Sequence, residues 1–204
     1  MTAKSRMAVE RLFEATPLVH PHVLDAYEKA VGVLKRHQIP HRLVGGLALN
    51  MLGVGRPTGD VDIVVPKGLW HKALKLLSPL ATDSQGLYLG LEDEPEGGMA
   101  LAGPHGVYIE LWPEGTTHGE IARLRGYSKR HPAGHMAFSL GGDGLVGLIN
   151  SKLASHLSAT DRLKDAADVQ RLIQKLKLPA EFKAKLDRRV QGEYQRLWRS
   201  AQPS

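Results

Sequence analysis

The sequence predicts an α+β protein with a helical C-terminal region, and two observations support this class. Between residues 42 and 112, short apolar runs that alternate with period two are separated by glycines, prolines and helix-length segments. After residue 141, apolar residues recur at helical spacing. We therefore expect a core over residues 1–140, built on a small mixed β-sheet flanked by helices, and a helical region over 141–204 that packs on this core.

The elements of the core follow from these patterns in chain order. Apolar residues at helical spacing predict a first helix over 22–37, and the alternation of Val61, Ile63 and Val65 predicts a strand over 60–65. The other expected elements are a strand over 42–44, a helix over 47–52, a helix over 69–77, a weak strand over 87–89 and a hairpin of strands over 99–102 and 107–112.

The core ends with a basic segment that we expect to be a long loop, over 113–136, followed by a last strand over 137–140. The three helices expected after it cover 144–157, 161–176 and 180–198. The last of these is rich in lysine and arginine, which predicts either a solvated basic face or a surface that binds RNA phosphates.

Composition limits the classes of protein that the chain can belong to. There are 204 residues and no cysteine, which excludes a disulfide framework, a thiol nucleophile and a zinc site of the cysteine type. No apolar run approaches the roughly 20 residues of a membrane span, so we expect a cytoplasmic protein with no membrane partner. The net charge of +6 favours a polyanionic partner such as RNA, or a nucleotide.

Asp60 and Asp62 stand two residues apart on a predicted strand, so their side chains share a face with about 6–7 Å between alpha carbons. Two ionised groups that close repel by roughly 2–3 kcal/mol at an effective dielectric near 20. A divalent cation would remove this repulsion, and carboxylate oxygens are ligands that Mg²⁺ prefers. The alternative is that both acids simply face solvent.

Gly45 and Gly46 follow a predicted strand and open a predicted helix. Without side chains there, a phosphate could approach the free N–H groups of the helix start. The alternative is a tight turn between strand and helix. The stretch is not a P-loop, because no Gly-Lys-Ser or Gly-Lys-Thr follows.

Charged residues also fall on the apolar stripes of two successive C-terminal helices. The spacing of Leu145, Leu148 and Ile149 predicts that Lys152 points inward. Asp165 and Asp168 lie one turn before the apolar stripe of the next helix. Buried charges are costly unless they meet each other or a ligand, so these residues predict either a buried Lys–Asp bridge or part of a binding pocket.

The order strand, Gly-Gly, helix, and then Arg56-x-Thr58-x-Asp60-x-Asp62 entering a strand, resembles the nucleotidyltransferase superfamily that includes DNA polymerase β. The resemblance implies the nucleotidyltransferase fold and the transfer of a nucleoside monophosphate from an NTP to an acceptor, with release of pyrophosphate. It also implies two Mg²⁺ ions, held by the two aspartates and a third carboxylate on a neighbouring strand. That third position corresponds to Glu110, where many members carry Asp.

Lys152 followed by Arg162-x-Lys164-Asp165-x-x-Asp168 is similar to motifs of a narrower group. This group is the AbiEii/AbiGii type of nucleotidyltransferase toxins of type IV toxin–antitoxin systems, and the resemblance covers about residues 23 to 176. It implies an antitoxin protein as a possible partner.

By this resemblance, Asp60, Asp62 and Glu110 would bind the metal, and Glu110 would also act as base for the acceptor hydroxyl. Lys152 would neutralise charge on the leaving pyrophosphate. The other residues expected to bind the nucleotide are Gly45, Gly46, Arg56, Thr58, Asp165 and Asp168. Arg56 and Thr58 have the alternative role of shaping the turn, and Asp165 and Asp168 that of orienting Lys152.

The sequence therefore predicts a Mg²⁺-dependent nucleotidyltransferase with RNA, such as tRNA, as acceptor. A second prediction is transfer to a small molecule, for which the acids at 92–94 and 96 would supply an acceptor pocket. A third, of another class, is a nucleotide-binding or RNA-binding protein without catalysis.

Overall fold

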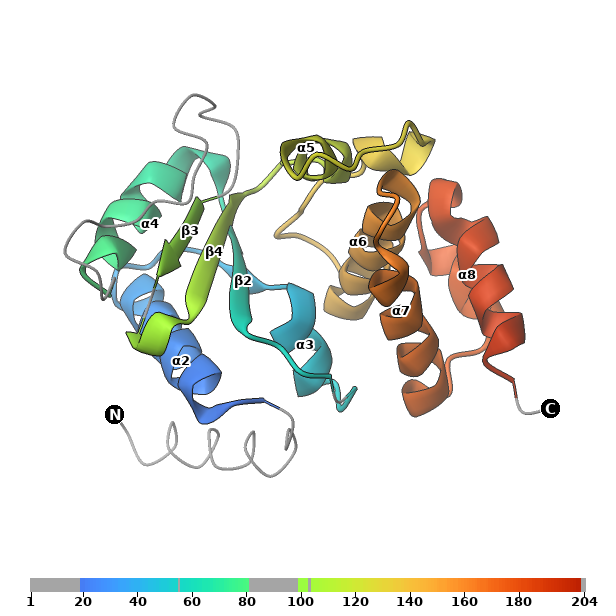
Figure 1. The fold of residues 1–204 in the computed structure, drawn as a ribbon, viewed down its shortest axis with the longest axis horizontal. Coiled ribbons are helices and arrows are strands. Elements are labelled where there is room, and N and C mark those ends of the chain that lie inside the picture. Colours follow the sequence, from blue (N-terminus) through green and yellow to red (C-terminus); the bar gives the residue numbers. More distant parts are fainter. Residues whose placement is uncertain (1–18, 55, 81–98, 103, 203–204) are drawn as a thin grey trace. The chain divides into compact units, whose positions relative to one another are not determined.

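The computed structural model describes residues 19–54, 56–80, 99–102 and 104–202 (Figure 1). By packing, the described residues divide into two compact units, the first comprising those up to residue 80 together with those of 99–111, and the second comprising those from 112 onward. Within the described ranges, no helix is both long enough and apolar enough to cross a membrane. The α+β class is confirmed.

The first unit is built on a four-stranded sheet with the strand order β1-β2-β4-β3. The strands are β1 (Arg42–Leu43), β2 (Asp60–Val65), β3 (Met99–Ala102) and β4 (Tyr108–Pro113). β1 pairs antiparallel with β2, and β3 pairs antiparallel with β4, with Ala100 opposite Glu110. The predicted hairpin is thus confirmed, and its connection contains a short 3-10 helix over Pro104–Gly106.

One face of this sheet carries the core of the first unit. Helices α2 (Pro21–Arg36) and α4 (Trp70–Leu77) contribute buried apolar residues to the same cluster as Val61, Ile63 and Ile109 of the strands. The indole Nε1 of Trp70 donates a hydrogen bond of 3.0 Å to the carbonyl oxygen of Leu111, which fixes α4 on β4. The alternation predicted for both strands is therefore the observed division between core face and opposite face.

The second unit consists of helices packed around α6 (Gly144–Ser158). Its other helices are α5 (His118–Leu124), α7 (Leu163–Leu176) and α8 (Arg188–Ser200), with 3-10 helices over Pro132–His135 and Ala180–Lys185. The single helix predicted over 180–198 is wrong, because Asp187 caps the start of α8 by accepting from the backbone N–H of Arg189. The indole of Trp198 donates to the carbonyl of Leu178 at 3.0 Å, which holds α8 against the end of α7.

The basic segment over 113–136 was expected to be a loop, and this expectation is wrong. It contains α5, which begins with a reciprocal cap in which Thr117 accepts from the backbone of Glu120 and the Glu120 carboxylate accepts from Thr117. Such a cap satisfies N–H groups that a helix start otherwise leaves unbonded. The division by packing therefore falls before α5, whereas the helical pattern of the sequence begins after residue 140.

The last predicted strand, over 137–140, is also wrong. Ala137 forms only an isolated bridge with Thr117, and Phe138 exchanges backbone hydrogen bonds with the turn at Gly115 and Thr116. This short stretch closes a loop instead of joining a sheet. The weak strand predicted over 87–89 lies outside the described residues.

Candidate active site

Two neighbouring strands of the first unit present carboxylates on the same face of the sheet. Val61 and Ile63 of β2 belong to the core, so Asp60 and Asp62 face the opposite side. On β4, Ile109 belongs to the core and Glu110 faces the opposite side by the same alternation. Because β2 and β4 are adjacent, the three predicted acids share one face, and all three are partly buried.

The glycine pair lies directly against these acids. Gly45 has a φ of +67°, and a side chain there would place its Cβ 2.6 Å from the Cγ of Asp62. A Cβ at Gly46 would lie 2.5 Å from the Oγ1 of Thr58. Close packing therefore requires glycine at both positions, and the positive φ of Gly45 fits the tight turn between strand and helix that the sequence left open as the alternative role.

The side chains of Asp62 and Thr58 thus occupy part of the space next to the two glycines. Gly45 opens α3 (Gly45–Met51), a helix of seven residues. The backbone N–H of Val44, just before it, donates 3.0 Å to the carbonyl oxygen of Asp62. The structure brings the glycines and the acids together, while the phosphate-binding role of Gly45 and Gly46 stays a prediction.

A buried asparagine fixes the turn that precedes the acids. The side-chain amide of Asn50 donates to the carbonyls of Gly46, at 3.0 Å, and Arg56, at 2.8 Å. Its oxygen accepts from the backbone N–H of Arg56 at 3.1 Å. Thr58, two residues further, donates from its hydroxyl to Oδ1 of Asp60 at 2.8 Å. Arg56 and Thr58 both shape this turn, whatever else they bind.

Asn50 was not predicted from the sequence. Its signal was a single amide in the apolar run from Leu47 to Leu52, where a fully buried polar residue must find partners. The partners are backbone groups of a turn whose shape the sequence does not specify.

The second unit holds the predicted lysine and its two aspartates in direct contact. Nζ of Lys152 lies 2.8 Å from Oδ1 of Asp165 and 3.0 Å from Oδ2 of Asp168. The two aspartates are almost completely buried, and the lysine side chain is 9% exposed. The buried Lys–Asp bridge between α6 and α7, one of the two alternatives from the sequence, is therefore present, while nucleotide binding by these residues stays a prediction.

The charge of this cluster is balanced locally. Burial opposes ionisation of Asp165, but the Lys152 ammonium, hydrogen bonds from Lys152 and Ser155, and the Arg162 guanidinium outweigh it, so the pKa of Asp165 lies below its usual range. The Arg162 guanidinium lies over the ring of Tyr127, 5.6 Å from its centroid. Asp165 is accordingly a carboxylate with its counter-ion already supplied by the protein.

His118 is a further buried titratable group near this cluster, and the sequence analysis did not single it out. Burial lowers the pKa of His118 to about 4, against an opposite but smaller effect of Asp165. Its ring packs edge to face with Phe138, with 5.0 Å between centroids. The imidazole is therefore neutral at pH 7.

The acids of the first unit fit a magnesium ion as a partial ligand set. No group of three or more histidine, aspartate or glutamate side chains is arranged as a metal cage among the residues that the structure describes. However, Mg²⁺ usually takes only one or two protein carboxylates and fills its octahedron with water and substrate phosphates. Asp60 and Asp62 supply donors of this kind, with oxygen atoms on one sheet face.

The sequence matches no known family model and no curated protein. Among solved structures, it is similar to a Thermotoga maritima CCA-adding enzyme complexed with tRNA, with 18% identity, a TM-score of 0.43, and coverage of 95% of this chain and 44% of that one. A CCA-adding enzyme in complex with CTP gives 16% identity, a TM-score of 0.44, and coverage of 95% and 48%. A tRNA-processing enzyme gives 17% identity, a TM-score of 0.35, and coverage of 89% of this chain and 57% of that one. The chain thus spans about half the length of these proteins.

Proposed function

We propose that the chain is a Mg²⁺-dependent nucleotidyltransferase that moves a nucleoside monophosphate from an NTP to an acceptor hydroxyl. The observation that carries this proposal is that Asp60, Asp62 and Glu110, from two adjacent strands, face the same side of the sheet. Carboxylates gathered on one face repel each other, and a divalent cation relieves that repulsion.

In this proposal, Asp60 and Asp62 hold the metal. When bound, magnesium would polarise the reacting phosphate and offset the charge that develops on the pyrophosphate. The hydroxyl of Thr58, which donates to Asp60, keeps one carboxylate oxygen oriented and leaves the other for a ligand. Asn50 supports this geometry by holding the turn before the strand.

Glu110 has a separate role in the proposal. It would accept the proton of the acceptor hydroxyl as that oxygen attacks the α-phosphorus and the bond to pyrophosphate breaks. Its neighbours Ile109 and Leu111 are fully buried, so the strand that carries Glu110 is anchored in the core. A base on a rigid strand is held in position better than one on a loop.

Lys152 is the residue whose proposed role is most demanding. To neutralise charge on pyrophosphate, it would have to keep or exchange its contacts with Asp165 and Asp168. A substrate phosphate could replace one carboxylate as its partner, since both are anionic oxygen ligands. A Lys152→Arg variant tests this role, because it keeps the charge and changes the geometry.

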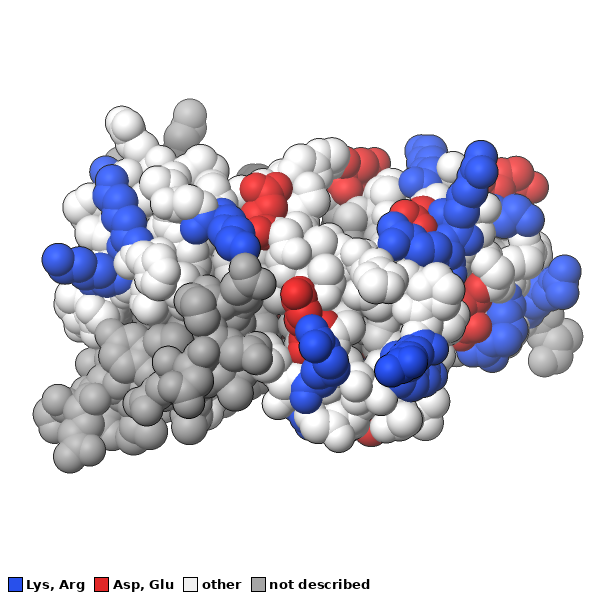
Figure 2. Space-filling model, turned by 90° about the horizontal axis from the view of Figure 1, so that it is seen from above, with Lys and Arg blue, Asp and Glu red and all other residues white. Residues whose placement is uncertain are grey.

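For the acceptor we propose RNA, such as tRNA, on the basis of the net charge of +6. Figure 2 shows that Lys and Arg side chains form several separate groups on the face it displays. Two of the basic residues predicted on the last helix form ion pairs within the protein, because Arg189 binds Asp187 and Arg196 binds Glu193. Part of the positive charge of this helix is thus neutralised before any RNA binds. Transfer to a small molecule remains the second proposal, and its acids at 92–94 and 96 lie outside the described residues. Action as the toxin of a toxin–antitoxin pair is proposed from the sequence motifs alone.

The direct test is to incubate the purified chain with Mg²⁺, each labelled NTP in turn, and total RNA. Label in RNA supports the first proposal, label in a small product supports the second, and NTP that stays intact with every acceptor rejects catalysis. Asp62→Asn should abolish transfer. Asp161→Asn, at an exposed acid of the second unit, is the matched control and should leave transfer unchanged.

Binding can be tested without turnover. A non-hydrolysable NTP analogue with Mg²⁺ should raise the melting temperature of the protein. At an analogue concentration of about 100 times Kd, binding adds about 2.7 kcal/mol to the free energy of unfolding. The shift should disappear in Asp60→Asn. A non-catalytic nucleotide-binding protein would show the shift but no transfer.

A further inference from the structure

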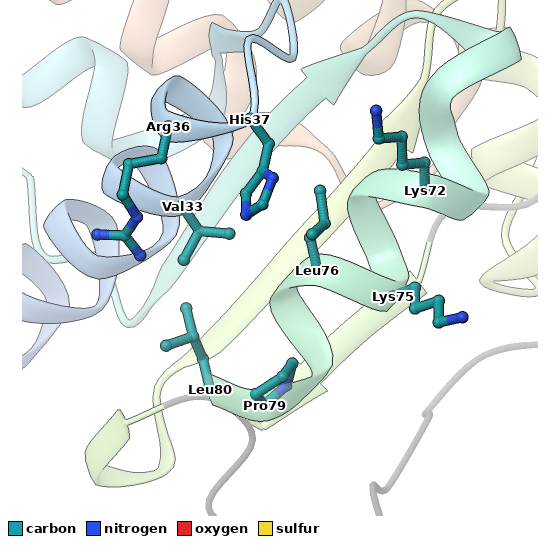
Figure 3. A pocket seen from close by; sticks show the side chains of 8 residues that line it. All are labelled: Val33, Arg36, His37, Lys72, Lys75, Leu76, Pro79 and Leu80. Carbon is teal, nitrogen blue, oxygen red and sulfur yellow. The ribbon is translucent and has the colours of Figure 1, made fainter.

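An open groove of about 500 Å³ lies between α2 and α4, on the outside of the two helices that cover the core face of the sheet. Figure 3 shows the side chains that line it. Val33 comes from α2, Leu76 from α4, and Pro79 and Leu80 from the turn that follows α4. The groove therefore belongs entirely to the first unit, and the candidate active site lies on the other face of the same sheet.

The floor of the groove is apolar and firmly supported. Val33 is buried, and Leu76 and Leu80 are partly buried and packed against the core cluster. In Figure 3, Val33, Leu76 and Leu80 surround one central space, with the ring of His37 beside them. Since core packing fixes these side chains, the floor is preformed for an apolar ligand group.

The rim of the groove is basic on both sides. Arg36 lies on the α2 side, and Lys72 and Lys75 lie on the α4 side (Figure 3). All three are exposed, and no acidic side chain lines the groove among the residues that the structure describes. None of the three forms an ion pair with another residue in the part of the chain that the structure describes. As far as the described residues go, these cations are thus available to pair with a ligand that brings its own negative charge.

We propose that this groove binds an acidic peptide segment of a partner protein, with leucine-like side chains on the floor and carboxylates against Arg36, Lys72 and Lys75. The apolar floor and basic rim match the two faces of an amphipathic acidic segment, since amphipathic helices lay their apolar face into hydrophobic grooves and the basic rim selects for acidic residues on the other face. This proposal goes beyond the proposed transferase activity and does not depend on it.

Two other occupants fit the observations less well. RNA would pair its phosphates with the rim and could stack one base on the ring of His37, but it would gain little from the aliphatic floor of Val33, Leu76 and Leu80. A second copy of the chain in a two-fold dimer would bring the same basic rim against itself, and like charges at close range repel.

The test uses the full chain and a fluorescent synthetic peptide of about 12 residues with leucines four apart among glutamates. The peptide should bind with saturation, and two matched peptides should not: one with every glutamate changed to glutamine, and one with every leucine changed to serine. Loss with the first shows the role of charge, and loss with the second shows the role of the floor.

Variants then locate the binding. Lys72→Glu/Lys75→Glu should weaken the acidic peptide by at least about fivefold, since each exposed pair contributes a few tenths to 1 kcal/mol. Lys129→Glu/Lys175→Glu, which makes the same charge change at exposed lysines of the second unit, is the control and should leave binding unchanged. Leu76→Asp should also abolish binding, with circular dichroism showing that the fold is kept.

Each remaining outcome overturns the proposal. These are no saturable binding up to about 1 mM peptide, equal weakening in both double variants, preference for an RNA oligonucleotide over the peptide with the same dependence on Lys72 and Lys75, and self-association lost in Lys72→Glu/Lys75→Glu. Asp62→Asn must bind the peptide as the unchanged protein does, so failure of the transferase proposal would leave this result intact.

Discussion

The two units of the chain differ in the burial and pairing of their aspartates. In the second unit, Asp165 and Asp168 are almost fully buried and share the ammonium group of Lys152. In the first unit, Asp60 and Asp62 lie partly exposed on a sheet face, beside a glycine pair that lets the backbone approach them. The first arrangement contains its own counter-ion, whereas the carboxylates of the second lie where a cation from solvent can reach them.

This difference separates structural acids from candidate catalytic ones. A buried, paired carboxylate contributes to folding, and its loss should appear in stability. A partly exposed carboxylate on a rigid strand contributes little to folding, and its loss should appear in activity. The following variants test this division, from the largest expected effect to the smallest.

Asp62→Asn should reduce nucleotide transfer by at least about 100-fold, because the amide keeps the shape but loses the charge that the proposed metal would require. The free energy of unfolding, measured with urea, should change by less than about 1 kcal/mol. Rates are measured with the labelled NTP that the unchanged protein uses. If Asp62→Asn lost stability and kept transfer, Asp62 would be a structural acid and not a catalytic one.

Lys152→Met should lower the free energy of unfolding by about 3–5 kcal/mol, because two buried carboxylates lose their counter-ion. Lys175→Met, at an exposed position of α7, is the control and should change it by less than about 0.5 kcal/mol. Adding Asp165→Asn and Asp168→Asn to Lys152→Met should recover part of the loss. A loss below about 1 kcal/mol would mean that the bridge is not a structural element.

His118 should make the protein less stable in mild acid. The folded state holds the pKa of His118 at about 4, whereas the unfolded chain takes up a proton below about 6.5. The unfolded state therefore binds more protons between these values, so stability is complete above pH 6.5 and falls as the pH drops towards 4, by about 3 kcal/mol.

Urea unfolding at pH 7, 5.5 and 4 measures this effect. His118→Leu should flatten the dependence over that range, and His71→Leu, at an exposed histidine of the first unit, should keep it. Equal dependence in the unchanged protein and in His118→Leu would show that His118 is not the group that titrates.

Gly46→Ala should cost about 1–3 kcal/mol, because the new Cβ would lie 2.5 Å from the Thr58 hydroxyl and 2.9 Å from an Arg56 nitrogen. Gly32→Ala, in the middle of α2 with open space around the new Cβ, is the matched control and should stabilise the protein by up to about 1 kcal/mol. Thr58→Ala should relieve part of the cost at Gly46. If Gly46→Ala behaved as Gly32→Ala does, the turn would have room that the geometry denies.

The sequence predicted those features that depend on local periodicity. Alternation along residues 60–65 and 107–112 identified both strands and the face that carries Asp60, Asp62 and Glu110. Helical spacing likewise predicted that Lys152 and Asp165 point inward. In each case the residues that form the pattern lie within a few positions of one another in the sequence.

Features that depend on contacts between distant segments could not be predicted in the same way. The start of α5 is a different case, because its signal, Thr117-x-x-Glu120, is local. It was missed because the basic, loop-like composition of the segment favoured a loop. The backbone partners of Asn50 and the close approach of Gly45 to Asp62 arise from how α3 folds back on β2. Periodicity identifies which side of an element is buried and does not identify what it meets there.

The tryptophans offer a way to observe the two units separately. Trp70 is buried in the first unit with its indole bonded to β4, Trp112 lies on β4 at the division between the units, and Trp198 lies on α8 of the second unit. These are the three tryptophans of the sequence. A Trp112→Phe/Trp198→Phe variant would carry a single emitter in the sheet unit, and Trp70→Phe/Trp112→Phe would leave a single emitter, Trp198, in the helical unit. Fluorescence during denaturation would then show whether the unit that carries Asp60 and Asp62 melts before, after or together with the unit that carries the lysine bridge.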